Sequence, residues 1–524
     1  MENAVEALKI AGAVLMFILA LSLSISCLSS ANSSVLNIAS MYSREREYRY
    51  VKPASDFTRT VGIESIIPAM YQAYEENTEI YFKDKNGNPL PLYYKTNQYG
   101  KRVDSEGDIV DNSSTIAVTI NYINLEKDGV IYYFIDNEYY FGDPYLYKWN
   151  DLERFAFFDK AALEILKHLD WKPDIIHCHD WQTGMVPVLL NAYYNKDTFY
   201  QGIKTVFTIH NLRYQGIYSI DIVSDFFSLN RDFFTADKLE FHGCANLLKG
   251  GIVYSDYITT VSPTYASEIQ TPMGGEKLDG LLSARSQSLY GILNGIDYNV
   301  YNPKTDKYIF ENYDARNVVN KKRENKMKLQ QQLGLTVDGE KVMIGIISRL
   351  VDQKGFDIIA EAMGELMNMD IQLVVVGTGE AKYENLFRHN AWCNSQKMSA
   401  NIMFSNELAH KVYASCDIFL MPSMFEPCGL SQMISLAYGT IPVVRETGGL
   451  KDSIMPYNEF TGEGNGFSFY PYTAHDMMYT LRYAIKIFSD KKAWTDLIKN
   501  AMRQDFSWNE SAKKYQDMYN RLLG

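Results

Sequence analysis

One pattern recurs along this chain and limits what it can fold into. A short apolar run is followed by a polar turn, and the turn by a segment with the apolar spacing of a helix. The unit appears at residues 173–190, 205–218, 256–270 and 291–297. Repetition of strand, turn and helix is typical of a parallel sheet with helices on both faces. The sequence therefore predicts an α/β, doubly wound fold.

A second series of the same kind begins further along, at residues 342–363, and continues at 371–380, 418–423 and 441–444. At 524 residues the chain is too long for one hydrophobic core. We expect a first Rossmann-like domain over residues 115–305 and a second over 306–524. The amphipathic stretch 150–169 predicts a helix in the first domain. The charged stretch 320–335 predicts a solvated helix near the connection between the domains.

The chain upstream of residue 115 has a different character. Residues 10–28 carry no charge and are long enough to cross a bilayer as a helix, which takes roughly 20 residues. Basic residues follow this run (Arg44, Arg46, Arg49) and almost none precede it, so the bulk of the chain is expected in the cytoplasm. We interpret residues 1–50 as a membrane anchor with a basic flank, with a buried core helix as the alternative. Residues 51–114 are polar and turn-rich and predict a small β-rich segment of unknown role.

Composition excludes some partners. The net charge of -12 argues against nucleic acid, because no basic stripe is present. The six cysteines are scattered, which fits a reducing compartment and cytosolic chemistry. His177 and His179 are separated by one residue on a turn with no third ligand nearby, so we expect no metal site and no cofactor. A histidine at a strand end is better suited to bond a substrate hydroxyl or carry a proton.

The most informative single stretch runs from Ser423 to Val444. Glu426 lies between an aromatic residue and a Pro-Cys-Gly turn, directly after the apolar run 418–423. A carboxylate there sits at the carboxyl end of a strand, where open α/β sheets bind ligands. Residues 430–438 should form a helix opening at the same place, and the turn Thr447-Gly448-Gly449 is a second candidate anion cradle.

Cations and glycines in the second domain point to a phosphorylated substrate. Arg349 and Lys354 lie five residues apart across a strand-to-helix turn, so both could reach a diphosphate. Gly377 and Gly379 follow the next predicted strand and are further candidates for phosphate contact.

The ordered motifs HCHDWQTG, TIHNLRYQG, NLLKGG, SRLVDQKGFD, FEPCGLSQM and ETGGLKDSI closely resemble those of bacterial glycogen synthases and plant starch synthases that use ADP-glucose. The resemblance covers residues 115–524. It implies the GT-B arrangement of two Rossmann-like domains facing a cleft, with a final helix crossing back to the first domain. It also implies transfer of glucose from ADP-glucose to the non-reducing end of an α-1,4-glucan, with retention and without a metal.

The resemblance also assigns roles to residues. Glu426 would hold the donor glucose and stabilise the transition state, Arg349 and Lys354 would neutralise the leaving diphosphate, and His179 would bond the donor glucose. The remaining carried-over positions are the phosphate-binding Thr447, Gly448, Gly449, Gly377 and Gly379, and the sugar- or acceptor-binding Asn246, Lys249, His210 and Asn211.

Two departures from the family pattern leave alternatives open. The family's Lys-Thr-Gly-Gly loop is not found; Lys95-Thr96 is followed by Asn-Gln. The first domain is therefore expected to be incomplete. Gly142-Asp143-Pro144 stands where the family commonly carries an arginine. The second hypothesis is therefore a catalytically silent, membrane-tethered protein that binds glucan or nucleotide. A third is a related transferase using UDP-glucose or GDP-mannose.

Overall fold

The computed structural model describes residues 121–127, 129–142, 147 and 150–524. The chain divides into two units, residues 1–112 and 113–524, and every described residue belongs to the second. The predicted anchor at 10–28 and the segment 51–114 lie outside the described residues, as do Lys95-Thr96 and Asp143-Pro144. Within the described part of the chain, no helix has the length and apolar character needed to span a membrane.

The first half of this unit contains a four-stranded parallel sheet in the order β3-β4-β8-β9. Its strands are β3 (Ile175–His179), β4 (Lys204–Ile209), β8 (Tyr257–Thr260) and β9 (Leu289–Gly291). The helices between them are α4 (Asp151–His168), α5 (Met185–Ala192), α6 (Ile220–Phe227), α7 (Leu247–Tyr254), α8 (Pro263–Glu268) and α9 (Asp279–Ala284). Central strand residues such as Phe207 and Ile258 are fully buried, as expected for a parallel sheet covered on both faces. The repeated strand and helix units are confirmed.

Among the described residues, β3 forms one edge of this sheet, because its recorded strand partner is β4 alone. The strands follow chain order across the sheet with no reversal. An incomplete first domain stays a prediction, since residues 1–120 lie outside the described part. A separate small sheet, β5-β7-β6, lies in the same half, with strands β5 (Ile217–Tyr218), β7 (Cys244–Asn246) and β6 (Glu240–Phe241).

The second half contains a six-stranded parallel sheet in the order β12-β11-β10-β13-β14-β15. Its strands are β10 (Val342–Ile347), β11 (Ile371–Val376), β12 (Met398–Asn401), β13 (Ile418–Met421), β14 (Ile441–Arg445) and β15 (Phe467–Phe469). The order reverses between β10 and β13, which pair through Ile344 and Ile418. Ligands of doubly wound sheets bind at such a switch point, outside the carboxyl ends of the strands.

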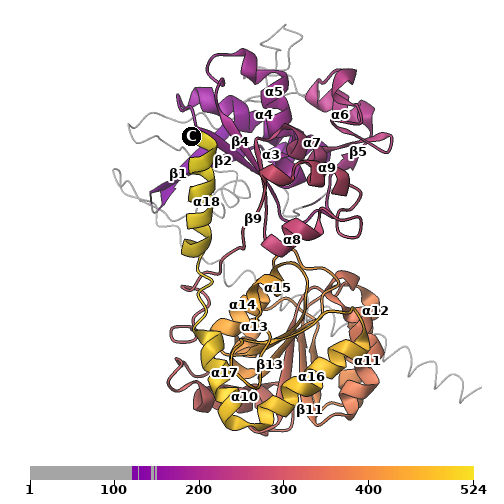
Figure 1. Cartoon of the computed structure of the whole chain (residues 1–524), viewed down its shortest axis with the longest axis vertical. Helices are drawn as coiled ribbons and strands as arrows, with labels where there is room; N and C mark the ends of the chain where they lie inside the picture. The colour runs from indigo at the N-terminus through magenta and orange to yellow at the C-terminus, as the bar shows by residue number, and fades with distance from the viewer. Residues whose placement is uncertain (1–120, 128, 143–146, 148–149) are drawn as a thin grey trace, which may run out of the picture. The chain divides into compact units, whose positions relative to one another are not determined.

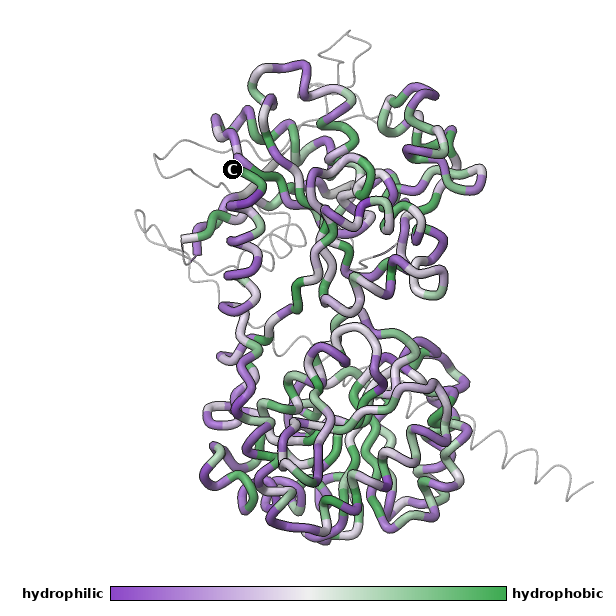
Figure 2. The backbone as a smooth tube through the Cα atoms, in the orientation of Figure 1, coloured by the Kyte–Doolittle hydropathy of each residue, from purple (hydrophilic) through white to green (hydrophobic). Residues whose placement is uncertain are grey.

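Helices cover both faces of the second sheet (Figure 1). They are α10 (Val318–Leu333), α11 (Phe356–Asn368), α12 (Ala381–Cys393), α13 (Asn406–Ser415), α14 (Ser431–Ala437), α15 (Gly448–Ser453), α16 (Ala474–Ser489) and α17 (Lys491–Met502). Figure 2 shows hydrophobic segments in the interior of this half and hydrophilic ones on its outer turns. The predicted helix at 430–438 is confirmed by α14.

The helix predicted at residues 320–335 is present, and the prediction that it is solvated holds for only one of its faces. Helix α10 forms there, but Lys322 and Lys326 are only 4% and 2% exposed. The Nζ atom of Lys326 lies 2.7 Å from Oδ2 of Asp417. Nζ of Lys322 donates to Oγ1 of Thr440 at 2.6 Å. Buried partners compensate both lysines, and a sequence without its tertiary contacts cannot reveal them.

The last helix, α18 (Trp508–Leu523), packs on the first sheet, although the chain has by then completed the second. Met518 is buried against Val206 of β4 and Ile292. The two stretches that join the halves run side by side, because Ile296 donates its amide to the carbonyl of Phe506 at 2.8 Å. The C-terminal helix thus becomes part of the first domain's core.

A two-stranded antiparallel hairpin precedes α4. Strands β1 (Asn121–Lys127) and β2 (Val130–Asp136) pair in register from Asn121 opposite Asp136 to Lys127 opposite Val130. A short helix, α3 (Glu138–Phe141), follows them. The helix predicted at 150–169 is confirmed, since α4 spans Asp151–His168.

Candidate active site

The site is built around an ion pair at the switch point of the second sheet. Glu426 follows β13, and Lys354 ends the turn that joins β10 to α11. Nζ of Lys354 donates to Oε1 and Oε2 of Glu426 at 2.9 Å and 2.6 Å. Ser423 donates its hydroxyl to Oε2 at 3.0 Å. Two of the predicted catalytic side chains are therefore in contact, and Glu426 is only 5% exposed.

Glycines let the surrounding turns close on this pair. Gly355, next to Lys354, has φ +78°, and a Cβ there would lie 2.1 Å from the carbonyl oxygen of Pro422. A Cβ on Gly448 would lie 2.0 Å from the carbonyl oxygen of Glu426. The amide of Gly449 donates to that same carbonyl at 3.1 Å. The Thr-Gly-Gly turn thus supports the backbone of Glu426, because only glycine permits so close an approach.

The predicted anion cradle holds a carboxylate of the chain itself. Thr447 donates its hydroxyl to Oε1 and Oε2 of Glu268 at 3.0 Å and 3.2 Å. The amide of Gly448 donates to Oε1 at 3.0 Å. Glu268 ends α8, on the first sheet's half of the unit. This turn therefore does bind an anionic group, and the group that it binds is Glu268.

Arg349 differs in its surroundings from Gly377 and Gly379, the two candidate phosphate-binding glycines that follow β11. The side chain of Arg349 is exposed and forms no hydrogen bond or ion pair with any residue that the structure describes. A Cβ on Gly377 would lie 1.9 Å from the carbonyl oxygen of Ser348, and one on Gly379 would lie 2.2 Å from that of Leu350. Both glycines therefore let the β10 and β11 turns touch, whereas Arg349 is available to a ligand.

Histidines occupy the carboxyl ends of β3 and β4. His179 is exposed, and its Nδ1 lies 3.1 Å from Nε2 of His210. The amide of His210 donates to Oδ1 of Asp180 at 2.8 Å. Although the residue keeps an exposed face, partial burial of its ring, with a smaller contribution from His210, lowers the pKa of His179 to about 4. His179 is therefore a neutral hydrogen-bonding group at physiological pH.

The predicted sugar-binding residues Asn246 and Lys249 are buried within the first domain. Oδ1 of Asn246 accepts the Lys249 amide at 2.9 Å and so caps α7, while Nδ2 donates to Oε1 of Gln215 at 2.6 Å. Nζ of Lys249 donates to the carbonyls of Ala236 and Glu240, both at 2.6 Å. Their polar groups are engaged by the protein. Asn211, half-buried, accepts the amide of Arg213 at 3.1 Å.

Three residues of this arrangement escaped the sequence reasoning. The apolar run 418–423 predicts that Ser423 ends a strand and gives it no role at the site, although a serine three residues before a carboxylate is a possible hydrogen-bond donor to it. Glu268 lies in the repeated unit at residues 256–270, far from residue 447 in the chain. The hydroxyl of Tyr519 on α18 forms a hydrogen bond with Nδ1 of His177 at 2.6 Å, although the two residues are 342 positions apart in the chain. No local sequence pattern predicts the contact of Glu268 with the turn at residue 447 or the contact of Tyr519 with His177.

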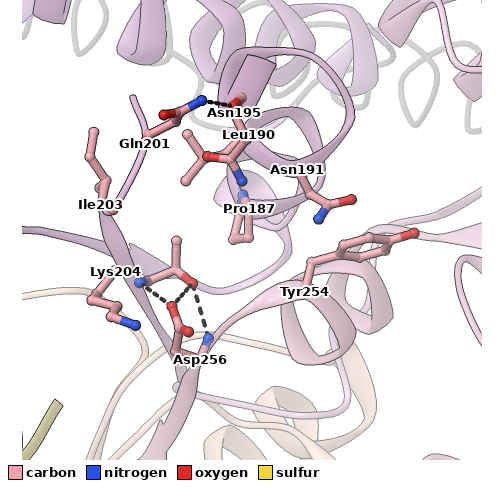
Figure 3. A pocket seen from close by; sticks show the side chains of 11 residues that line it. Pro187, Leu190, Asn191, Asn195, Gln201, Ile203, Lys204, Tyr254 and Asp256 are labelled. Atoms are coloured by element: carbon pink, nitrogen blue, oxygen red, sulfur yellow. Dashed lines mark hydrogen bonds between the residues drawn. The ribbon is translucent and has the colours of Figure 1, made fainter. Parts of the chain in front are cut away.

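A cavity of about 340 Å³ lies elsewhere in the first domain (Figure 3). Its walls include Lys204, at the start of β4, and Asp256, just before β8. Oδ2 of Asp256 is already taken, since it accepts the amide and hydroxyl of Thr205 at 2.8 Å and 2.9 Å. The cavity opens at the amino ends of the strands, opposite to His179 and His210. Parallel sheets bind ligands at the carboxyl ends, so this cavity is not the active site.

Comparison with known families gives two matches, one over most of the first sheet and one over the second. Residues 89–284 match the family described as "Starch synthase catalytic domain", and residues 328–504 match "Glycosyl transferases group 1". A solved structure, the catalytic domain of Starch Synthase IV from Arabidopsis thaliana bound to ADP and acarbose, is similar with a TM-score of 0.71. It is 34% identical, over 77% of this chain and 85% of that one.

Several curated relatives are more similar in sequence. Glycogen synthase of Lachnospira eligens is 54% identical over 77% of this chain and 85% of its own length. Glycogen synthase of Desulforamulus reducens is 52% identical, over 77% of this chain and 84% of its own length. The fold and the ion pair at the switch point, together with these matches, define a glycosyltransferase with two Rossmann-like domains. More particularly, the chain belongs to the glycogen synthase family.

Proposed function

We propose that this protein transfers glucose from ADP-glucose to the non-reducing end of an α-1,4-glucan, with retention of configuration. The observation that carries the proposal is the Lys354 and Glu426 pair at the switch point, in a chain 54% identical to a glycogen synthase. ADP and acarbose, an oligosaccharide, are the ligands named for the similar starch synthase. A nucleotide and a glucan chain are therefore the ligand classes to test first.

The reaction breaks the bond between the anomeric carbon and the diphosphate oxygen. The bonding electrons leave with ADP, while a hydroxyl oxygen of the glucan bonds to the anomeric carbon and passes its proton to the leaving diphosphate. Negative charge therefore grows on the diphosphate and positive charge on the sugar. Preorganised charges aimed at these positions are the largest contribution that a protein can make to such a step.

The four predicted catalytic residues each have a part in this scheme. Lys354 and the exposed Arg349 neutralise the diphosphate, Arg349 as a planar fork and Lys354 as a point charge. Glu426, held by Lys354 and Ser423, stabilises the positive sugar and bonds its hydroxyls. Neutral His179 offers a ring nitrogen to the donor glucose from the first domain.

Cys428 has no part in the scheme, although it lies two residues from Glu426. Burial raises the pKa of its thiol to about 12, so it stays protonated at neutral pH. A protonated, buried thiol is a poor nucleophile.

The test is incorporation of labelled glucose from ADP-glucose into glycogen by the full chain, with Glu426→Ala as the inactive control. Incorporation above that control supports the proposal. ADP binding without incorporation would instead support a silent binding protein, the alternative raised by the missing Lys-Thr-Gly-Gly loop. The named synthases among the relatives do not favour that alternative. UDP-glucose and GDP-mannose are the comparison donors.

Membrane tethering of a cytoplasmic catalytic part is a separate proposal, supported by the uncharged run at residues 10–28. Deleting residues 1–30 and fractionating the cells tests it. The full chain should then pellet with membranes and the shortened chain should not. Equal distribution of both would contradict tethering.

A further inference from the structure

The imidazole ring of His179 lies against a second ring that is itself firmly held. His177 and His179 stack with centroids 4.4 Å apart and planes at 25°. Nδ1 of His177 lies 2.6 Å from the hydroxyl of Tyr519, and Nε2 lies 2.6 Å from Oγ1 of Thr208. Both nitrogens of His177 are thus bonded. Nε2 of His179 has no partner among the residues described here.

The hydroxyl that fixes His177 comes from the end of the chain. Tyr519 lies on α18, which the buried side chain of Met518 anchors to the first sheet. Thr208, the other partner of His177, lies 2.5 Å from Oγ1 of Thr259 in the fully buried centre of the sheet. His177 is therefore held between the sheet and the last helix.

We propose that Tyr519 and His177 are positioning residues for His179. Tyr519 fixes the ring of His177, and the stacked ring of His177 fixes the plane in which His179 presents Nε2 to the donor sugar. The inference rests on the proposed function, because His179 acts on a sugar only there. Burial, with a smaller effect of the neighbouring histidines, lowers the pKa of His177 to about 3. A neutral ring can accept from one hydroxyl and donate to the other.

The test compares Tyr519→Phe with Tyr290→Phe, a tyrosine that packs beside α18 without contacting a histidine. Loss of the Tyr519 hydroxyl should lower kcat about tenfold, which corresponds to one hydrogen bond lost from the transition-state geometry. The KM for ADP-glucose should stay within about twofold, because donor binding is shared among many contacts. The same kcat in Tyr519→Phe as in Tyr290→Phe would overturn the proposal.

Histidine resonances of the free protein give a readout that needs no turnover. In Tyr519→Phe the imidazole signals of both His177 and His179 should shift, and in Tyr290→Phe neither should. Unchanged signals in Tyr519→Phe would also overturn the proposal. If Tyr519→Phe fails to fold, His177→Gln replaces it with the same expectations for kcat and for His179. Wild-type protein without incorporation would contradict the proposed function and leave the spectroscopic result standing.

A second observation concerns Glu268, whose carboxylate fills the cradle of Thr447 and Gly448. Helices α8 and α15 each bind a carboxylate that belongs to the other. Asp452 of α15 accepts hydrogen bonds from the amide and the hydroxyl of Thr264 at 2.9 Å and 2.6 Å. Glu268 at the other end of α8 accepts from Thr447 and Gly448. Each helix thus receives an acceptor at its amino end, where amide groups are unpaired.

We infer that Glu268 is a built-in competitor of the donor's phosphate group. A diphosphate that uses the Gly448 amide and the Thr447 hydroxyl must first displace this carboxylate. This inference also rests on the proposed function. The chain would exist in a self-occupied and a donor-competent state, and donor affinity would be reduced by the fraction that is self-occupied.

The test is ADP affinity measured by calorimetry for the full chain, for Glu268→Gln and for Asp452→Asn. Glu268→Gln should bind ADP about fivefold to tenfold more tightly, because removing the competing charge raises the donor-competent fraction. Asp452→Asn weakens the contact between Asp452 and Thr264 and leaves the carboxylate of Glu268 in place. This variant should bind ADP no more tightly than wild type. Glu268→Ala is the replacement variant if the glutamine of Glu268→Gln keeps the contacts with Thr447 and Gly448.

If Glu268 supported the ADP site, its mutation would weaken ADP binding. The sign of the change in ADP affinity therefore distinguishes a competing Glu268 from a supporting one. Equal or weaker ADP binding by both Glu268 variants would overturn the inference. Absence of ADP binding in wild type and variants alike would contradict the proposed function instead.

Discussion

Lys354 contacts both carboxylate oxygens of Glu426, with Nζ 2.9 Å from Oε1 and 2.6 Å from Oε2. The side chains are 17% and 7% exposed, so the pair is largely removed from water. A lysine that holds a carboxylate this way in the free protein has its positive charge already placed where the donor's diphosphate is proposed to leave. The pair can therefore act without reorganising when the substrate arrives.

Glu426→Gln should lower kcat by about 100-fold to 1,000-fold, the usual effect of removing one preorganised electrostatic group. It should also lower the free energy of unfolding by about 3 kcal/mol, because the partly buried ammonium of Lys354 loses its counter-ion. Incorporation assays and urea titration measure the two effects. The control is Glu407→Gln, since Glu407 pairs with Lys411 while 60% exposed. A surface pair is worth at most about 1 kcal/mol, so the control should retain activity and stability.

Gly448→Ala should disrupt the site through its backbone. Gly448 has φ +42°, and the added methyl group would lie 2.0 Å from the carbonyl oxygen of Glu426. The matched control is Gly462→Ala, which also has a positive φ, +71°, but meets nothing within 4 Å. The control should lose about 1 kcal/mol through conformational strain alone. Gly448→Ala should lose more than that and also lose incorporation; equal losses in the two variants would contradict the packing role.

The sequence predicted the elements that depend on local pattern. The strand ending before Glu426, the helix after it and the repeated units of both sheets carry apolar periodicity that a short window reveals. It could not predict Glu268 in the anion cradle, because that contact joins residues 268 and 448 through the packing of α8 on α15. Nor could it predict that Asn246 would cap α7 and be buried. A sequence motif specifies residue types, while the burial and the partners of those residues depend on the folded chain.

The same limit explains why the prediction for α10 holds for only one of its faces. Its lysines and glutamines read as a solvated surface, but Nζ of Lys326 lies 2.7 Å from Oδ2 of Asp417, with the side chains 3% and 10% exposed. The charge pattern of a sequence shows which residues lie on one face of a helix, but it does not show what packs against that face.

Lys326→Met should therefore cost about 3 to 5 kcal/mol of unfolding free energy, because it leaves the Asp417 carboxylate buried without its cation. Lys328→Met is the control on the same helix. Lys328 pairs with Glu311 but its side chain is 47% exposed, and such a pair contributes about 1 kcal/mol or less. Urea unfolding of both variants measures the difference. Equal losses would show that the Asp417 contact adds nothing to stability.

Asp159 of α4 makes stability depend on pH in the opposite direction to an ordinary ion-paired carboxylate. It is fully buried, and burial raises its pKa well above the usual range, more than the nearby amide of Met185 lowers it. The folded state therefore retains the proton where the unfolded state releases it. The resulting stability is fully present at pH values below the unfolded pKa, near 3.9. It is lost as pH rises through the folded pKa.

Asp159→Asn removes this titration, since an amide has the shape of the protonated acid and no charge to bury. The variant should gain stability relative to wild type as pH rises from about 5 to about 8, a range that begins above the unfolded pKa. Urea unfolding at several pH values measures the difference. Asp370→Asn is the control, since the Asp370 side chain is 88% exposed, and its difference from wild type should stay constant over that range. A constant difference for Asp159→Asn as well would mean that Asp159 is ionised in the folded protein.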